Sequence, residues 1–133
     1  MLRKLILIPF LFIAFGASSQ SYLQDSAWVM DNYTKKELYI PMRDGVKLFT
    51  AIYTPKDMSE KHPILMRRTP YSCAPYGEQN FPSNLWTRHW RYYARENYIF
   101  VVQDVRGAWM SEGEFEDVRP FNPNKKGLSL IHI

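Results

Sequence analysis

Two short motifs hold most of the residues of this sequence whose types and spacing could do chemistry, and each follows an apolar run. The first is Arg68-Thr69-Pro70-Tyr71, in which a proline stiffens the backbone immediately before a phenol hydroxyl, a hydrogen-bond donor. The second is Gln103-Asp104-Val105-Arg106-Gly107, and Ser111-Glu112-Gly113 follows it closely. The second motif stands where a strand would end and the chain must turn.

The charged residues of the second motif favour a structural role. Asp104 and Arg106 have opposite charges and are close in sequence, so we expect them to pair with each other and to bond to loop backbone. Gly107 and Gly113 suit positions where a side chain would clash. A catalytic carboxylate at Asp104 is the less favoured alternative.

Other chemistries are less well supported by the residue types. Cys73 is the one cysteine, so it cannot form an internal disulfide, and a thiol nucleophile there would need a histidine partner from His62, His89 or His132. No thiol-enzyme motif surrounds it, which favours a packed thiol. The acids of the later loop match no calcium-loop spacing, and a solvated loop is the favoured interpretation for Glu112, Glu114, Glu116 and Asp117. We expect neither a metal nor an organic cofactor.

The elements that would position these motifs follow from hydrophobic patterning. Alternating apolar residues on both sides of Asp44-Gly45 predict a β-hairpin over 36–54, with Leu38, Ile40 and Met42 on one face of its first strand. The unalternating run at 63–68 predicts a strand covered on both faces. A loop rich in Pro, Gly, Tyr and Ser then extends to Ser83, and long ordered loops are often functional.

A crossover unit is predicted after this loop. Apolar residues at helical spacing indicate a helix over 85–96, with Ser83 or Asn84 as its N-cap and Asn97 at its end. A β-branched and aromatic run at 98–102 predicts a second buried strand. Strand, helix and strand in this order predict a βαβ unit of a mostly parallel sheet, hence an α/β fold.

The paired motifs resemble the X-Pro dipeptidyl-peptidase, cocaine esterase and α-amino acid ester hydrolase group of α/β-hydrolases, over about residues 35–127. In that group an Arg-x-Pro-Tyr motif follows the corresponding strand, and its tyrosine hydroxyl completes the oxyanion hole. The resemblance therefore implies that Tyr71 donates a hydrogen bond to the oxyanion of acyl transfer, a contact typically worth about 3 kcal/mol. The resemblance also implies that five residues near the site have structural roles: Arg68, Pro70, Asp104, Arg106 and Gly107.

The match departs from the family pattern at two places. Ala108-Trp109-Met110 stands where the family often has a second glycine, which alters the wall of the pocket. No Gly-x-Ser-x-Gly elbow occurs, and Ser72, Ser83 and Ser111 lack the elbow context. We expect the triad serine, aspartate and histidine to lie beyond Ile133, so that the sequence is the inactive N-terminal portion of the enzyme.

The ends of the chain suggest targeting and truncation. Residues 1–20 have the basic n-region, apolar h-region and small residues of a signal peptide, which implies a secreted or periplasmic protein. Residues 21–34 are expected to be an N-terminal extension, residues 35–127 a partial α/β-hydrolase domain, and the abrupt apolar residues 128–133 a non-native tail.

The expected function is hydrolysis or transfer of an acyl group from a small ester, amide or peptide through an acyl-enzyme, including X-Pro dipeptidyl-peptidase or α-amino acid ester hydrolase activity. Nucleic acid is disfavoured as a partner, because the net charge of +4 falls by two without Arg3 and Lys4 and the other cations form no cluster. The alternative is a small secreted binding domain, whose contact surface would be Tyr76, Trp86, Trp90, Tyr92 and Tyr93.

Overall fold

The computed structural model of this chain describes residues 23–115. The predicted signal peptide at 1–20 and the predicted tail at 128–133 lie outside the described residues. Within the described range, no helix is both long enough and apolar enough to cross a bilayer.

The predicted hairpin is confirmed, and it is slightly longer than 36–54. Strand β1 (Tyr33–Pro41) pairs antiparallel with β2 (Lys47–Pro55) along its whole length. Gly45 occupies the turn with a φ of 84°, a conformation that glycine adopts without strain. The Asp44 carboxylate accepts a hydrogen bond from the Val46 amide at 3.2 Å and closes the turn.

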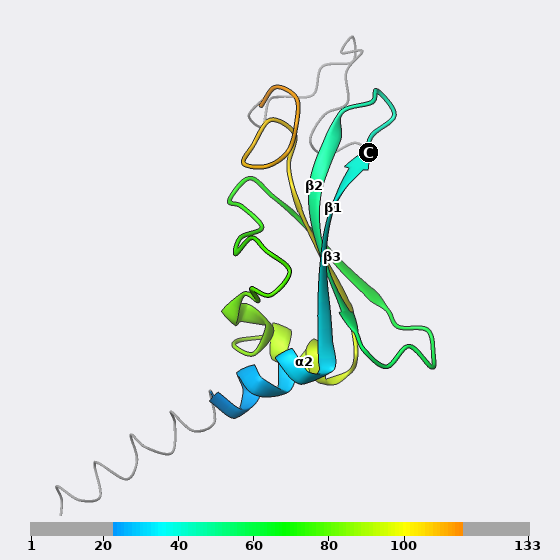
Figure 1. The fold of residues 1–133 in the computed structure, drawn as a ribbon, viewed down its shortest axis with the longest axis vertical. Coiled ribbons are helices and arrows are strands. Elements are labelled where there is room, and N and C mark those ends of the chain that lie inside the picture. The colour runs from blue at the N-terminus through cyan, green and yellow to red at the C-terminus, as the bar shows by residue number, and fades with distance from the viewer. Residues whose placement is uncertain (1–22, 116–133) are drawn as a thin grey trace, which may run out of the picture.

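The predicted crossover is also present. Strand β3 (Ile64–Thr69) pairs parallel with β4 (Ile99–Asp104), and β4 pairs antiparallel with β2. The sheet therefore has the order β1-β2-β4-β3, and the two motifs leave β3 and β4 at the same end (Figure 1). Antiparallel strands leading into a parallel pair are the arrangement that the resemblance implied for the N-terminal part of an α/β-hydrolase fold.

The single helix predicted over 85–96 is wrong in extent. The segment contains a short 3₁₀ helix, η2 (Ser83–Leu85), and a separate helix, α2 (Trp90–Arg95). Arg88 between them has a φ of 54°, which no continuing helix allows. Burial of Leu85, with no exposed area, accompanies this break, so packing overrides the helical spacing. Asn97 does end the segment, with a φ of 57°.

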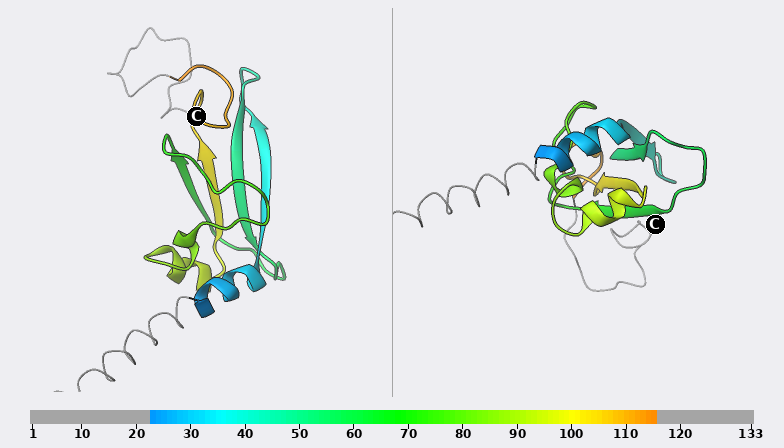
Figure 2. Two further views of the ribbon diagram at one scale, coloured as in Figure 1. Left: turned by 60° about the vertical axis from the view of Figure 1, so that its left-hand side comes forward. Right: turned by 90° about the horizontal axis from the view of Figure 1, so that it is seen from below.

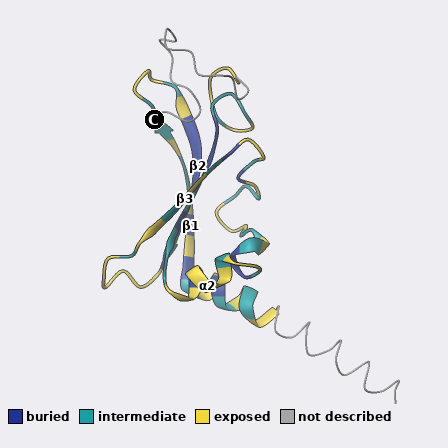
Figure 3. Cartoon of the chain, turned by 180° about the vertical axis from the view of Figure 1, so that it is seen from behind, coloured by how far each residue is buried: buried dark blue, intermediate teal, exposed yellow. Residues whose placement is uncertain are grey.

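The helices and the long loop cover only one face of the sheet (Figure 2). On that face Phe100 stacks on Trp90 with ring centroids 5.0 Å apart, within a core that also includes Tyr53 and Ala51. The prediction that β3 is covered on both faces is wrong for the described residues, because Ile64 is 65% and Met66 is 47% exposed (Figure 3).

The segment before β1 is helical over residues 23–32 and packs beneath the sheet (Figure 1). Its Val29 side chain belongs to the core, and Arg95 of α2 both pairs with Asp25 at 2.6 Å and lies over the Trp28 ring. Tyr33 is buried at the start of β1, where its hydroxyl donates to the carbonyl oxygens of Ala94 and Tyr98. Residues 23–33 therefore tie β1 to the crossover unit.

Candidate active site

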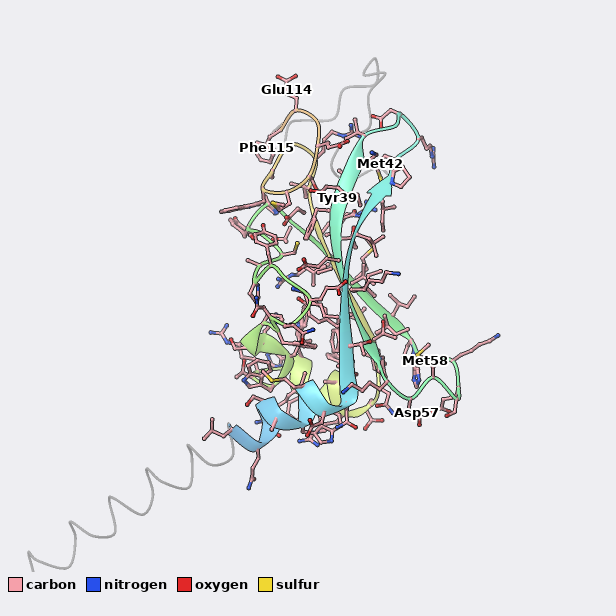
Figure 4. All side chains as sticks on the ribbon, in the orientation of Figure 1. Tyr39, Met42, Asp57, Met58, Glu114 and Phe115 are labelled. Carbon is pink, nitrogen blue, oxygen red and sulfur yellow. The ribbon has the colours of Figure 1, made fainter. Side chains whose placement is uncertain are left out.

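The tyrosine of the first motif lies on a tight turn directly after β3. Thr69, the last residue of β3, is buried, and its hydroxyl accepts a hydrogen bond from the Tyr71 amide at 3.0 Å. The Tyr71 side chain is 87% exposed, so the phenol projects away from the sheet. Figure 4 marks this end of the sheet by Glu114 and Phe115, opposite the connection that carries Asp57 and Met58. In α/β sheets ligands bind at the carboxyl ends of parallel strands, and Tyr71 occupies such a position.

Asp104 joins the loops that follow the two parallel strands. Its side chain has no exposed area, and its carboxylate accepts hydrogen bonds from the Cys73 amide at 2.7 Å and from the Tyr76 hydroxyl at 3.3 Å. The Met110 amide approaches the same carboxylate at 3.5 Å. Ser111 donates to the carbonyl of Asp104 at 2.8 Å. The position of the Tyr71 turn is thus coupled to the loop after β4 through one buried carboxylate.

The predicted pairing of Asp104 with Arg106 is wrong. The Arg106 guanidinium instead pairs with Asp44 in the hairpin turn, at 2.9 Å, and this hydrogen-bonded contact holds the pKa of the Asp44 carboxyl below its usual value. Asp104 points into the covered face, where neutral donors surround it. The two charges diverge because the chain turns immediately after β4.

Glycine at 107 is required by a close approach of backbone. Its φ is 65°, and a Cβ there would lie 2.0 Å from the Phe115 amide nitrogen. A Cβ at Gly113, where φ is 94°, would lie 2.8 Å from the Cγ of Arg106. The loop after β4 consequently folds back on itself more tightly than side chains would allow.

A buried ion pair holds the middle of the long loop. The Lys35 ammonium of β1, with no exposed side-chain area, lies 2.6 Å from Glu37 and donates to the carbonyl oxygens of Pro75, Gly77 and Asn80. The Glu37 carboxylate also accepts a hydrogen bond from the Gly77 amide. We name this pair and its loop partners the Lys35 clamp. It fixes the segment that follows the Tyr71 turn.

Arg68 and Pro70, the other two residues expected to support Tyr71 from the first motif, have different surroundings. Arg68 lies opposite Gln103 in the β3–β4 register, on the sheet face away from Asp104. Its Nε is buried without a hydrogen-bond partner among residues 23–115, and burial lowers the pKa of its guanidinium. The Pro70 carbonyl accepts a hydrogen bond from the Trp109 indole at 2.8 Å. Pro70 therefore connects the two motifs directly, whereas Arg68 belongs to the opposite face.

Cys73 is a packed thiol. It is 2% exposed, and burial, followed by the nearby Asp104 carboxylate, raises the pKa of its thiol to about 12. Beside it, against the covered face, a cavity of about 200 Å³ is lined by residues that include Tyr53 and Asn84. The Tyr53 hydroxyl and the side-chain amide oxygen (Oδ1) of Asn84 have no hydrogen-bond partners within residues 23–115. Tyr71 does not line this cavity.

The protonated state of Cys73 predicts low reactivity and a stability that falls in alkali. Only the thiolate is nucleophilic, so at pH 8 we expect the folded thiol to react with a disulfide reagent on the order of 100-fold more slowly than in concentrated urea. An unfolded thiol titrates near pH 8.5, so between that pH and about 12 the unfolded state loses its proton first. The contribution of Cys73 to the free energy of unfolding should therefore decrease through that window and stay constant below it.

A variant with a single exposed thiol provides the control for this measurement. The double substitution C73S and S59C moves the one cysteine to an exposed loop position, where reaction should be equally fast with and without urea. Rapid labelling of the native wild-type protein at pH 8 would contradict the burial of Cys73.

No nucleophile–histidine pair exists among the described residues. His62 bonds to the carbonyl of Asp57, Ser72 to the Tyr76 hydroxyl, and the Ser111 hydroxyl accepts a hydrogen bond from the Phe49 amide. Ser83 opens η2, and His132 lies outside the described residues. Residues 23–115 also contain no group of three acidic, histidine or cysteine side chains able to hold a metal ion.

Several residues of the site were not found by sequence reasoning. Lys35 and Glu37 lie on the same face of β1 as Tyr33. The alternation of residues along a strand does not by itself show which face is buried. Half-buried Tyr76 was assigned to a contact surface, although its hydroxyl bonds to Asp104. Ser111 and Glu112 were noted after the second motif, but Ser111 was given no structural role and Glu112 was expected in a solvated loop. The Ser111 hydroxyl donates to the Asp104 carbonyl, and the Glu112 carboxylate accepts a hydrogen bond from the Lys47 amide at 3.0 Å.

Comparison with known proteins supplies the family context of this geometry. The family model described as X-Pro dipeptidyl-peptidase (S15 family) matches residues 44–126. Cocaine esterase of Rhodococcus sp. (strain MB1 Bresler) is 36% identical over 85 residues, which make up 63% of this chain and 14% of that protein.

Two solved structures share both sequence and fold with the chain. An α-amino acid ester hydrolase is 40% identical with a TM-score of 0.58, over 69% of this chain and 16% of that one. An aminopeptidase from the marine sediment archaeon Thaumarchaeota archaeon is 36% identical with a TM-score of 0.60, over 74% of this chain and 17% of the aminopeptidase chain. The chain thus spans about one sixth of the length of these relatives.

Proposed function

The chain belongs to the X-Pro dipeptidyl-peptidase (S15) family, and on that premise we propose that it is the N-terminal part of a serine hydrolase acting on esters or amides. Its relatives are an esterase, an amino acid ester hydrolase and an aminopeptidase. The reaction would pass through an acyl-enzyme on a serine supplied by the remainder of the protein. Tyr71 would touch the substrate, and the residues behind it would position that tyrosine.

One observation carries this proposal, namely an exposed phenol on a turn that buried groups hold rigidly. Tyr71 is 87% exposed, whereas the neighbouring Cys73 amide is bonded to the fully buried Asp104. A turn whose backbone is fixed before the reaction reduces the reorganisation needed when negative charge develops on a substrate oxygen. This combination suits an oxyanion-hole tyrosine better than a packing residue, whose ring would be covered.

The alternative function, a small binding domain, would need an exposed aromatic surface, and most of that surface is buried in this fold. Trp86 is 8% exposed, and Trp90 and Tyr76 pack against the core, so that only Tyr92 and Tyr93 of the aromatic set remain exposed. Two tyrosines on a helix of six residues make a small contact area.

The test uses the full-length gene product. We expect a fluorophosphonate probe to label a single serine outside the present sequence, and p-nitrophenyl acetate or alanine p-nitroanilide to be cleaved with loss of activity on labelling. Absence of both labelling and cleavage would contradict a serine hydrolase. We further propose export through residues 1–20, which N-terminal sequencing of the protein recovered outside the cytoplasm would test by showing a start near residue 21.

A further inference from the structure

Trp109 has a backbone conformation that its side chain disfavours. It lies in the loop after β4, with a φ of 54°. Bulky residues rarely adopt positive φ, and such strain persists where surrounding contacts over-determine it, often at functional sites. Here the Ala108 amide bonds to Val105 and the Ser111 amide to Ala108, so turns on both sides hold the residue.

The indole of Trp109 is pinned at one edge while the ring stays open. Its Nε1–H donates to the Pro70 carbonyl at 2.8 Å, and Pro70 immediately precedes Tyr71. The side chain nevertheless remains 64% exposed. The hydrogen bond therefore fixes an aromatic surface beside the turn that carries the exposed phenol.

The loop that carries the indole is anchored on the carboxylate that also anchors the tyrosine turn. The Met110 amide approaches Asp104 at 3.5 Å, and the Cys73 amide bonds to it at 2.7 Å. Trp109 and Tyr71 are thus held relative to each other by two independent connections. A ring fixed in this way can contact a substrate group at little cost in side-chain entropy.

We propose that Trp109 is a specificity-determining residue, forming an aromatic wall beside the oxyanion donor that selects esters or amides with an aromatic ring next to the scissile carbonyl. This inference rests on the proposed function. A ring bound against the indole would gain offset-stacked or edge-to-face contact, which acetyl and methyl groups cannot make. The ring could belong to the acyl or to the leaving group, since both flank the carbonyl.

The test measures kcat and KM of the full-length protein on three esters. Methyl phenylacetate carries the ring on the acyl side, benzyl acetate carries it on the leaving side, and methyl acetate has none. For W109L we expect kcat/KM to fall about tenfold for one ring-bearing ester, mainly through KM, and to change less than about twofold for methyl acetate. The ester that loses most identifies the side on which the ring binds.

A second variant separates the wall from the hydrogen bond. W109F keeps a ring and removes the indole N–H, so it should retain most of the preference for the ring-bearing ester. Tyr92→Ala, at a residue of α2 that is 59% exposed, is the matched control and should leave the preference unchanged.

The outcomes are distinguishable from failure of the proposed function. Equal losses on all three esters in W109L would overturn the wall, because Trp109 would then only support the loop. Wild-type kcat/KM values on all three esters in W109L would also overturn it, while leaving the hydrolase intact. A wild-type protein that cleaves none of the esters and takes no fluorophosphonate would overturn both.

Discussion

Replacing Tyr71 by phenylalanine in the full-length protein is expected to lower kcat for an acyl ester about 100-fold while KM changes less than about threefold. The substitution removes a single hydroxyl that would meet the oxyanion only as charge develops on it. Tyr71 is 87% exposed among the described residues, so losing its hydroxyl disturbs no packing within this part of the protein. Steady-state kinetics on p-nitrophenyl acetate measure both constants.

The control for this result is Tyr92→Phe, which removes an exposed hydroxyl from α2. Its kcat should remain at the wild-type value. Slow native labelling of Cys73 in Tyr71→Phe would verify that the loop is intact. If kcat were unaffected by the loss of the Tyr71 hydroxyl, Tyr71 would have no part in the mechanism.

Replacing Lys35 by methionine is expected to destabilise the long loop by about 3–5 kcal/mol. The change leaves the Glu37 carboxylate, whose side chain is 16% exposed, without its cation, and removes the donor to three carbonyl oxygens. Cys73 lies in the same loop, so its thiol provides a local probe. Because each 1.4 kcal/mol or so corresponds to a factor of ten, a loss of this size should bring native labelling at pH 8 close to the rate in urea, an acceleration of up to about 100-fold.

The adjacent lysine offers a matched control. Lys36 lies on the opposite face of β1 and is exposed, so Lys36→Met should change the labelling rate little. Adding E37Q to K35M should restore part of the protection, because the unpaired carboxylate is then neutral. Equal rates in wild type and K35M would mean that the Lys35 clamp does not hold the loop.

Local chemistry made much of the fold predictable. Gly45 marked the hairpin turn because glycine accepts positive φ, and the alternation on both sides of it predicted paired strands. The β-branched run before Asp104 predicted β4, and Asn97 predicted the end of the preceding segment. The resemblance, for its part, selected Tyr71 and the polar residues around it as the candidate site.

The failures all concern contacts between distant residues. Arg106 was expected to bond to its neighbour Asp104, but the turn after β4 brings it to Asp44 instead. Lys35 has the residue type of a solvated position, yet the loop carbonyls of Pro75, Gly77 and Asn80 surround its ammonium. Helical spacing over 85–96 could not show that Leu85 would be buried separately from α2.

The amino-acid sequence by itself determined where the strands end, which turns need glycine, and that a phenol follows the first parallel strand. These properties depend on backbone sterics and on alternation over a few residues, which are local. Only the tertiary structure decided which face of the sheet is covered, which charges meet, and that Asp104 and Trp109 connect to the Tyr71 turn. Burial and hydrogen bonding depend on which segments pack together, and these contacts join residues more than thirty positions apart.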